Sequence, residues 1–333
     1  MAGENTVDIT TNYVGEAALP FIAPAILAAD SIVNGYITVK ENVKKTLFLQ
    51  RVTGTDIQAF VCDPFAASVT EDAIVLTEQP LTPDKLMFPM QLCKADFRDT
   101  WQADATGSGF ANSQVPQTFE SFLLEYAAMR NVEAIEKNIW HGDYNETTGA
   151  TTGGNAVTNF AGILARIVAG SPTHEATVAG AFTADAATTG IITHLDTLIA
   201  DCPPAIRGAE ATKIFMSRKS LYLLQRAMAG FQAVSAVDTG VSTIAPQFLG
   251  AARPTAILGY DIIVPAGFPD DTLIIGQVAN FFFGTDLTSD FTQATMVDMT
   301  QTDASDRLRI KFQYTGGCQV AWLDDLGVVR RTS

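Results

Sequence analysis

A long amphipathic helix, expected from Thr118 to Trp140, limits the folds that this sequence can adopt. Apolar side chains recur in this segment every three or four residues, which places them along one side of an α-helix. The residues of this stripe are Phe119, Phe122, Leu123, Tyr126, Met129, Val132, Ile135 and Ile139. We therefore expect one face of the helix to be buried against the rest of the protein, and we expect Gly142 to end the helix.

Two strand-forming segments precede this helix. Ile57–Cys62 and Lys85–Leu92 are expected to be the strands of a long hairpin, with prolines between them. A two-stranded hairpin is only marginally stable on its own. We therefore expect this one to lie on another surface, either of its own chain or of a neighbouring subunit.

The chain after the helix mixes further helices and strands. Residues 143–185 are expected to be mainly loop, with a brief apolar return to the core at Asn159–Leu164. The expected elements beyond them are a helix at 187–201, a strand at Lys213–Ser217, a helix at Arg218–Met228, and an antiparallel pair formed by Ala294–Asp298 and Arg307–Tyr314. This order favours an α+β fold in which a compact unit is inserted into a more extended one.

The composition excludes several classes of protein. The net charge of −15 argues against a nucleic-acid-binding surface, which needs clustered Lys and Arg. An acidic chain is still able to enclose nucleic acid, because a like-charged wall does not bind it tightly; a second interpretation is that the charge serves solubility alone. The four cysteines form no CxxC pair, so zinc and redox motifs are unsupported. We expect neither a signal peptide nor a membrane span.

Charged residues are unevenly distributed along the sequence. Between Arg51 and Lys85 there is no Lys or Arg but there are several carboxylates, so the expected hairpin has an acidic tip. The candidate assembly-interface residues are Glu71, Asp72 and Glu78 on the acidic side, and Lys40, Lys44, Lys45, Arg307 and Arg309 on the basic side. Positions 307, 309 and 311 share one face of a strand. This stripe is either a docking surface for an acidic partner or a solvated outer face.

No catalytic, cofactor-binding or metal-binding site is expected. The three histidines, His141, His174 and His194, belong to no metal-binding motif. The sequence also lacks a phosphate-binding loop, a complete dinucleotide fingerprint and a hydrolase nucleophile elbow. The expected protein is therefore non-enzymatic, and an enzyme without a recognised motif is a distant alternative.

The order of these parts resembles the major capsid protein of tailed bacteriophages, with the Hong Kong ninety-seven phage capsid fold that encapsulins share. The matching segments are Pro80–Leu86 followed by Leu92–Asp99, Glu133–Ile135 with Ile139–Gly142 and Phe160–Ile163, Lys213–Ser217 with the helix after it, and Leu258–Pro265 followed by Ile275–Gly276. The resemblance extends over nearly the whole chain. Each motif is weak alone, and their order carries the argument.

The resemblance implies a domain organisation. It predicts an N-terminal arm and the start of the peripheral (P) domain at 1–50, an extended E-loop hairpin at 51–98, and the P-domain spine helix with its following loop at 99–158. An inserted axial (A) domain follows at 159–287, and P-domain strands return at 288–333. The hairpin tip has no lysine and Lys85 lies at its exit, so the covalent cross-link of some family members is not expected. Because the sequence starts almost directly at the arm, a separate scaffold, or none, is implied.

The resemblance also implies a function. A protein of this family assembles with copies of itself into the hexamers and pentamers of an icosahedral shell, which encloses viral double-stranded DNA without sequence-specific binding. The implied partners are a portal, and scaffold or decoration proteins, with no membrane and no cofactor. The implied location is the virion, after assembly in the host cytoplasm. An encapsulin-like cargo shell is the alternative that this fold leaves open.

Overall fold

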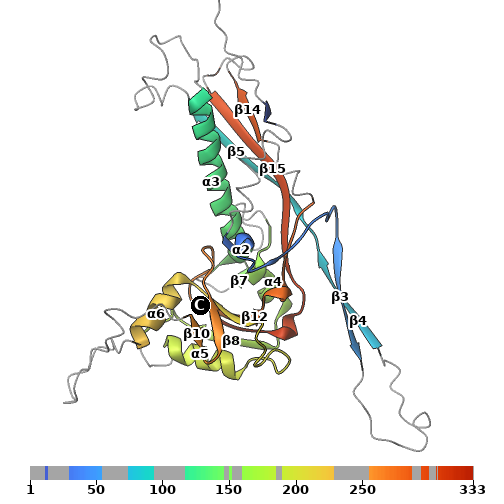
Figure 1. Ribbon diagram of the computed structural model, residues 1–333, viewed down its shortest axis with the longest axis vertical. Helices are drawn as coiled ribbons and strands as arrows, with labels where there is room; N and C mark the ends of the chain where they lie inside the picture. The colour runs from blue at the N-terminus through green and yellow to red at the C-terminus, as the bar shows by residue number, and fades with distance from the viewer. Residues whose placement is uncertain are drawn as a thin grey trace, which may run out of the picture.

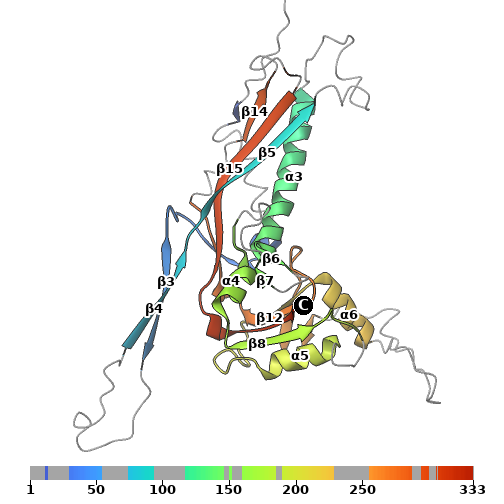
Figure 2. The same ribbon diagram turned by 180° about the vertical axis from the view of Figure 1, so that it is seen from behind.

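The long helix expected from the sequence is present as α3, Gln117–His141, in a computed structural model of the protein (Figure 1). The structure describes residues 12–13, 30–54, 74–93, 117–145, 150–151, 160–184, 190–228, 255–286, 294–299, 305 and 307–332. In Figures 1 and 2, α3 runs beside long strands, and a smaller α/β unit lies near the carboxyl end of the helix. The α+β class is thus confirmed.

The buried face of α3 differs in part from the expected one. Ile135 and Ile139 are buried as predicted, and they share a core with Leu124. Tyr126 and Met129 instead keep 48% and 65% of their surface exposed. Apolar residues therefore lie on two sides of this helix, and the apolar spacing alone does not show which side faces the core.

The first sheet is built around one long strand, β15 (Arg307–Val320). Its strand order is β1 (Asn12–Tyr13), β14 (Ala294–Asp298), β15, β13 (Phe281–Gly284) and β2 (Thr38–Lys40), and β5 (Asp84–Cys93) also pairs with β15. The antiparallel pairing of β14 with β15 confirms the expected pair. Alternate residues of β15 are buried in the same core as Leu124, namely Leu308, Ile310, Phe312 and Tyr314.

The expected hairpin pairing is wrong. Lys85–Leu92 forms most of β5, which pairs with β15 from Arg307↔Cys93 to Gly316↔Asp84. The two-stranded ribbon is instead β3 (Leu47–Gly54) paired with β4 (Ile74–Leu81), and Ile57–Cys62 lies outside the described residues. Alternating apolar residues in β5 do mark a half-buried strand, but alternation does not identify the partner strand.

The second sheet belongs to the smaller α/β unit. Its strand order is β10 (Ala256–Ile257), β11 (Tyr260–Ile263), β9 (Thr212–Met216), β12 (Thr272–Gln277), β16 (Leu326–Thr332) and β8 (His174–Ala179). Two helices, α5 (Ile191–Ala200) and α6 (Arg218–Met228), contribute to the core of this unit. The helix at Arg218–Met228 has the expected bounds, and the one expected at 187–201 is shorter.

Short elements connect the two sheets. They are α2 (Asp30–Val33), β6 (Tyr144–Asn145), β7 (Ala150–Thr151), α4 (Ile163–Gly170), and the 3-10 turns η5 (Val278–Asn280) and η7 (Leu323–Asp325). Helix α4 was expected only as an apolar return to the core. Its cap residue Gly162 makes no side-chain capping bond, so the usual start signal of a helix is missing from the sequence. Gly162 is needed for packing, because a Cβ there would lie 2.6 Å from the backbone oxygen of Asn138.

Candidate assembly surfaces

The β3–β4 ribbon projects away from both sheets (Figures 1 and 2). Phe48, Val52 and Leu76 are 54%, 65% and 53% exposed on it. The register pairs Phe48 with Pro80 and Val52 with Leu76, so these apolar side chains share one face of the ribbon. A contiguous apolar surface on a thin, exposed ribbon indicates a surface that is covered by a partner.

The base of the ribbon is fixed to the body. Arg51 Nη1 lies 2.5 Å from Asp325 Oδ2, and its guanidinium lies 5.5 Å from the centre of the Trp322 ring. Leu81, at the end of β4, is fully buried against Gly284, where a Cβ would lie 2.9 Å from the leucine side chain. The ribbon is thus held at one end and extends from there.

Of the three acidic candidates, only Glu78 lies in the described part of the chain. It is exposed on β4, and its Oε1 accepts a hydrogen bond from Gln50 Nε2 at 2.7 Å across the ribbon. Glu71 and Asp72 lie outside the described residues. A role for these three carboxylates in assembly stays a prediction.

The basic candidates near residue 40 lie among groups of the opposite charge. Lys40 ends β2, with its Nζ 5.7 Å from the centre of the Phe282 ring. Lys44 and Lys45 are exposed in the loop that follows, and Glu41 is exposed beside them. This region is therefore not a uniformly basic surface.

The structure does bring the second basic group together on one surface of the first sheet. Arg307 and Arg309 are exposed on β15, Lys311 is half-buried, and the register places Lys85 of β5 opposite Thr315 on the same side. We call the outward positions of β5, β14 and β15 the basic face: Lys85, Met87, Pro89, Gln91, Cys93, Thr295, Val297, Arg307, Arg309, Lys311, Gln313 and Thr315. None of these positions holds a carboxylate.

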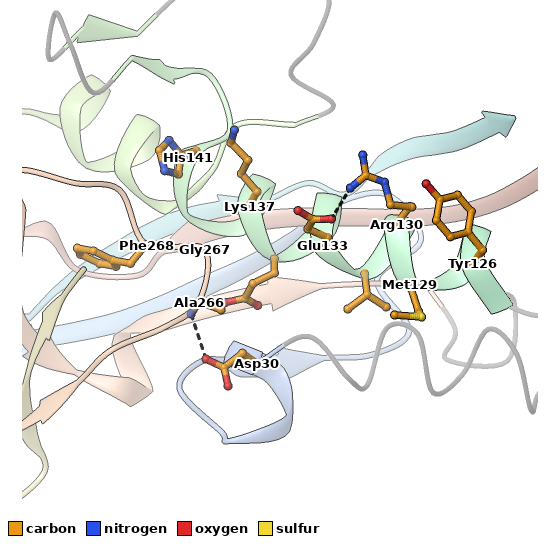
Figure 3. A pocket seen from close by; sticks show the side chains of 12 residues that line it. Asp30, Tyr126, Met129, Arg130, Glu133, Lys137, His141, Ala266, Gly267 and Phe268 are labelled. Carbon is orange, nitrogen blue, oxygen red and sulfur yellow. Dashed lines mark hydrogen bonds and ion pairs between the residues drawn. The ribbon is translucent and has the colours of Figure 1, made fainter. Parts of the chain in front are cut away.

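A groove of about 760 Å³ runs along the exposed side of α3. Figure 3 shows Tyr126, Met129 and Glu133 on the helix side of this groove, and Asp30 with Ala266–Phe268 on the other side. The exposed aromatic and thioether side chains make part of its wall apolar, and Arg130, whose Nη1 lies 2.8 Å from Glu133 Oε2, adds a charged pair. The groove therefore offers an apolar contact with charged edges.

A buried polar junction closes one side of this groove. Glu136 of α3 is 5% exposed; its carboxylate accepts hydrogen bonds from the Ser31 backbone nitrogen at 3.1 Å and from Ser31 Oγ at 2.5 Å. Trp140 Nε1 donates to the same Ser31 Oγ at 2.7 Å. Burial raises the pKa of Glu136, with hydrogen bonds from Ser31 opposing the shift.

Aromatic packing completes the junction. The Trp140 ring lies with its centre 5.0 Å from that of Phe268, 5.6 Å from that of Phe215 and 6.1 Å from that of Phe281. On the α2 side, Asp30 Oδ2 accepts a hydrogen bond from the Ala266 backbone nitrogen at 3.0 Å (Figure 3). The junction thus ties α2, the end of α3 and both sheets into one body.

The described residues offer no group of three or more His, Cys, Asp and Glu side chains placed to hold a metal ion. His194 is buried on α5 with its ring 4.6 Å from that of Phe182, and His174 Nδ1 lies 3.3 Å from Asp201 Oδ1. Cys93, Cys202 and Cys318 are free thiols, and burial raises the pKa of the latter two. Across the described segments, no helix is long and apolar enough to cross a membrane.

Comparisons with known proteins place this fold. No family model and no curated protein matches the sequence. A chain of the satellite phage P4 procapsid including size determination (Sid) protein aligns with a TM-score of 0.56 at 11% identity, over 96% of this chain and 90% of that one. A chain of Mycobacterium phage Ogopogo aligns with a TM-score of 0.55 at 12% identity, over 91% and 92%. A chain of the cyanophage A-1(L) capsid asymmetric unit aligns with a TM-score of 0.51 at 12% identity, over 100% and 97%.

The chain has the phage capsid fold. Within this capsid fold, the sequence patterns predicted the basic stripe of β15 but missed the contribution of Lys85, which belongs to it only because β5 pairs with β15. They also missed the junction of Ser31 with Glu136 and Trp140. These contacts join residues 105 and 109 positions apart, and no local spacing signals such a contact.

Proposed function

We propose that this protein is a structural, non-enzymatic capsid subunit that assembles with copies of itself into the hexamers and pentamers of an icosahedral shell. The shell would enclose viral double-stranded DNA, with the protein located in the virion after assembly in the host cytoplasm. A portal, and scaffold or decoration proteins, are the further proposed partners. The likeness in fold to phage capsid chains supports this proposal, although a fold alone does not fix a function.

The projecting β3–β4 ribbon is the single observation that carries the proposal. A protein that acts as a monomer has no evident use for a ribbon that is fixed only at its base and exposes Phe48, Val52 and Leu76. Burying these side chains against a neighbour would stabilise an assembly by about 25 cal/mol per Å² of apolar surface covered. In this proposal the ribbon corresponds to the E-loop of the family, and α3 to its spine helix.

Electron microscopy with negative stain, combined with light scattering, tests the proposal on the chain expressed alone and with its genomic neighbours. We expect closed shells, tubes or rings of hexamer size. Val52→Asp places a charge on the ribbon and should reduce the yield of particles. The matched control is Ile192→Asp, because Ile192 is 49% exposed in the first turn of α5, where an aspartate is favoured. A monodisperse monomer under both conditions would contradict the proposal.

A cargo shell of the encapsulin kind is the second candidate function, and the groove along α3 is the observation that favours it. A shell that packs proteins needs a binding surface for them, and this groove combines exposed Tyr126 and Met129 with charged edges. The contents of purified particles distinguish the two functions. Nuclease-protected DNA supports the viral shell, whereas a single co-purifying protein that is lost with Met129→Asp supports the cargo shell.

A further inference from the structure

We propose that the basic face of the first sheet receives the acidic hairpin segment, residues 55–73, of a second copy of this chain. The inference rests on the proposed function and deepens it. It selects one of the two basic groups that the sequence offers, and it gives the contact a direction from one copy to the next.

The basic face concentrates positive charge in an acidic protein. Lys85, Arg307, Arg309 and Lys311 lie on one side of two paired strands, in a chain whose net charge is −15. Successive outward residues of a strand are about 6.8 Å apart, so the cations of β15 repel one another. Within the described residues, none of the four forms an ion pair; Arg309 Nε donates only to the neutral Gln91 Oε1, at 3.0 Å.

Apolar side chains accompany these cations. Met87 and Val297 are both exposed and lie on the basic face, where Val297 pairs with Arg309 in the register. A cationic surface that also presents exposed apolar side chains suits a protein partner, which supplies carboxylates and apolar groups together. Nucleic acid would supply phosphates alone along most of its length.

The same chain supplies the complementary charge. Residues 55–73 contain Asp56, Asp63, Glu71 and Asp72 and no Lys or Arg. The strands that flank this segment are β3 and β4, so the ribbon carries it outward. A segment with carboxylates and no cation is the electrostatic complement of a face with cations and no carboxylate.

Pairing within one copy is opposed by the shape of the molecule. The far end of the ribbon and the Arg307 end of β15 lie toward opposite ends of the structure (Figures 1 and 2). A donor surface at one end and an acceptor surface at the other make a head-to-tail contact between copies. Contacts of this kind close into rings when the rotation permits it, which agrees with hexamers and pentamers.

The other basic group is the weaker candidate. Lys40 already lies over the Phe282 ring, and the exposed Glu41 carboxylate follows it directly. The loop after it is held by backbone bonds, with the Val43 nitrogen donating to the Thr285 oxygen at 2.9 Å. An acidic segment arriving there would meet both signs of charge.

Charge reversal in the full-length chain tests the inference. Arg307→Glu with Arg309→Glu should raise the concentration needed for assembly by about tenfold or more, the equivalent of a few weak ion pairs lost and replaced by repulsion. Lys44→Glu with Lys45→Glu is the matched control, because it changes the net charge equally on exposed side chains, and it should leave assembly within about twofold of the wild type. Circular dichroism checks that each variant is folded.

A charge swap provides the decisive arm. Adding Glu71→Lys and Asp72→Lys to the Arg307→Glu, Arg309→Glu chain should restore assembly, because each copy then offers a basic segment to an acidic face. Absence of rescue in the folded variant, or an equal loss in the Lys44, Lys45 control, would overturn the inference. Normal assembly of the Arg307→Glu, Arg309→Glu chain would overturn it while leaving the proposed function intact.

A labelled 30-base-pair DNA duplex tests the competing partner. If wild-type particles bind the duplex and the Arg307→Glu, Arg309→Glu chain still assembles but does not bind it, the basic face binds nucleic acid and the inference is wrong. If the wild type forms no ring or shell under any condition, the proposed function fails, and this inference fails with it.

Discussion

Glu136 allows the buried junction between α2 and α3 to be tested by two substitutions. Glu136→Gln keeps the shape of the side chain and one acceptor oxygen but removes the charge. Glu136→Ala removes both acceptors and leaves the buried backbone N–H and hydroxyl of Ser31 without them. An unsatisfied buried donor costs about 1–3 kcal/mol. We therefore expect the alanine variant to lose about 2 kcal/mol or more at pH 7, and the glutamine variant to stay within about 1 kcal/mol of the wild type.

The pH dependence distinguishes the charge from the shape. Burial raises the pKa of Glu136 above its ordinary value of 4.5, and the neighbouring Asp30 carboxylate adds to the rise. The folded protein therefore binds this proton more readily than the unfolded chain. The contribution of Glu136 to stability is fully present below pH 4.5 and is lost as the pH rises through the raised pKa. A single group changes the free energy of unfolding by at most about 1.4 kcal/mol per pH unit.

Urea unfolding of unassembled subunits between pH 4.5 and pH 8, followed by tryptophan fluorescence, measures this effect. Trp140 is a suitable reporter because its Nε1 donates to the Ser31 oxygen that Glu136 contacts. The wild type should lose stability relative to Glu136→Gln as the pH rises across this range. If the two proteins show parallel pH curves, or if glutamine destabilises as much as alanine, the reasoning about a buried charge is refuted.

Two further substitutions test the packing and the ribbon. Gly142→Ala should prevent stable folding, because its Cβ would lie 2.2 Å from the backbone oxygen of Phe160; soluble yield and melting temperature measure this, and a melting temperature near that of the wild type would contradict it. Arg51→Ala should remove the contacts with Asp325 and the Trp322 ring. We expect less than about 1 kcal/mol of lost stability from a half-exposed pair, but faster hydrogen exchange in β3 and β4, and unchanged exchange would show that Arg51 does not anchor the ribbon.

The sequence predicted those elements whose signals are local. The spacing of apolar residues located α3 and α6, and the alternation of apolar residues located β14 and β15. Partners between distant segments were not predictable in this way. The strand at Lys85–Leu92 was recognised, but its pairing with β15 brings together segments more than 200 residues apart, and nothing in either segment names the other.

The candidate site divides in the same manner. The shared face of Arg307, Arg309 and Lys311 follows from the two-residue period of a strand, and the structure confirms their arrangement. The exposure of Tyr126 and Met129 does not follow, because a helix with apolar residues on two sides has two possible buried faces. The assembly role of Glu71 and Asp72 stays a prediction, since both lie outside the described residues.

The position of β15 and β16 in their sheets has a consequence for the order of synthesis. β15 lies between β14 and β5, and β16 lies between β12 and β8, so residues 307–332 supply an interior strand to each sheet. On the ribosome, β5 and β8 are therefore made long before the strands that they flank, and neither sheet can close until those residues emerge. A nascent chain that lacks them has no basic face to offer, and the timing of translation thereby keeps unfinished subunits out of a growing shell.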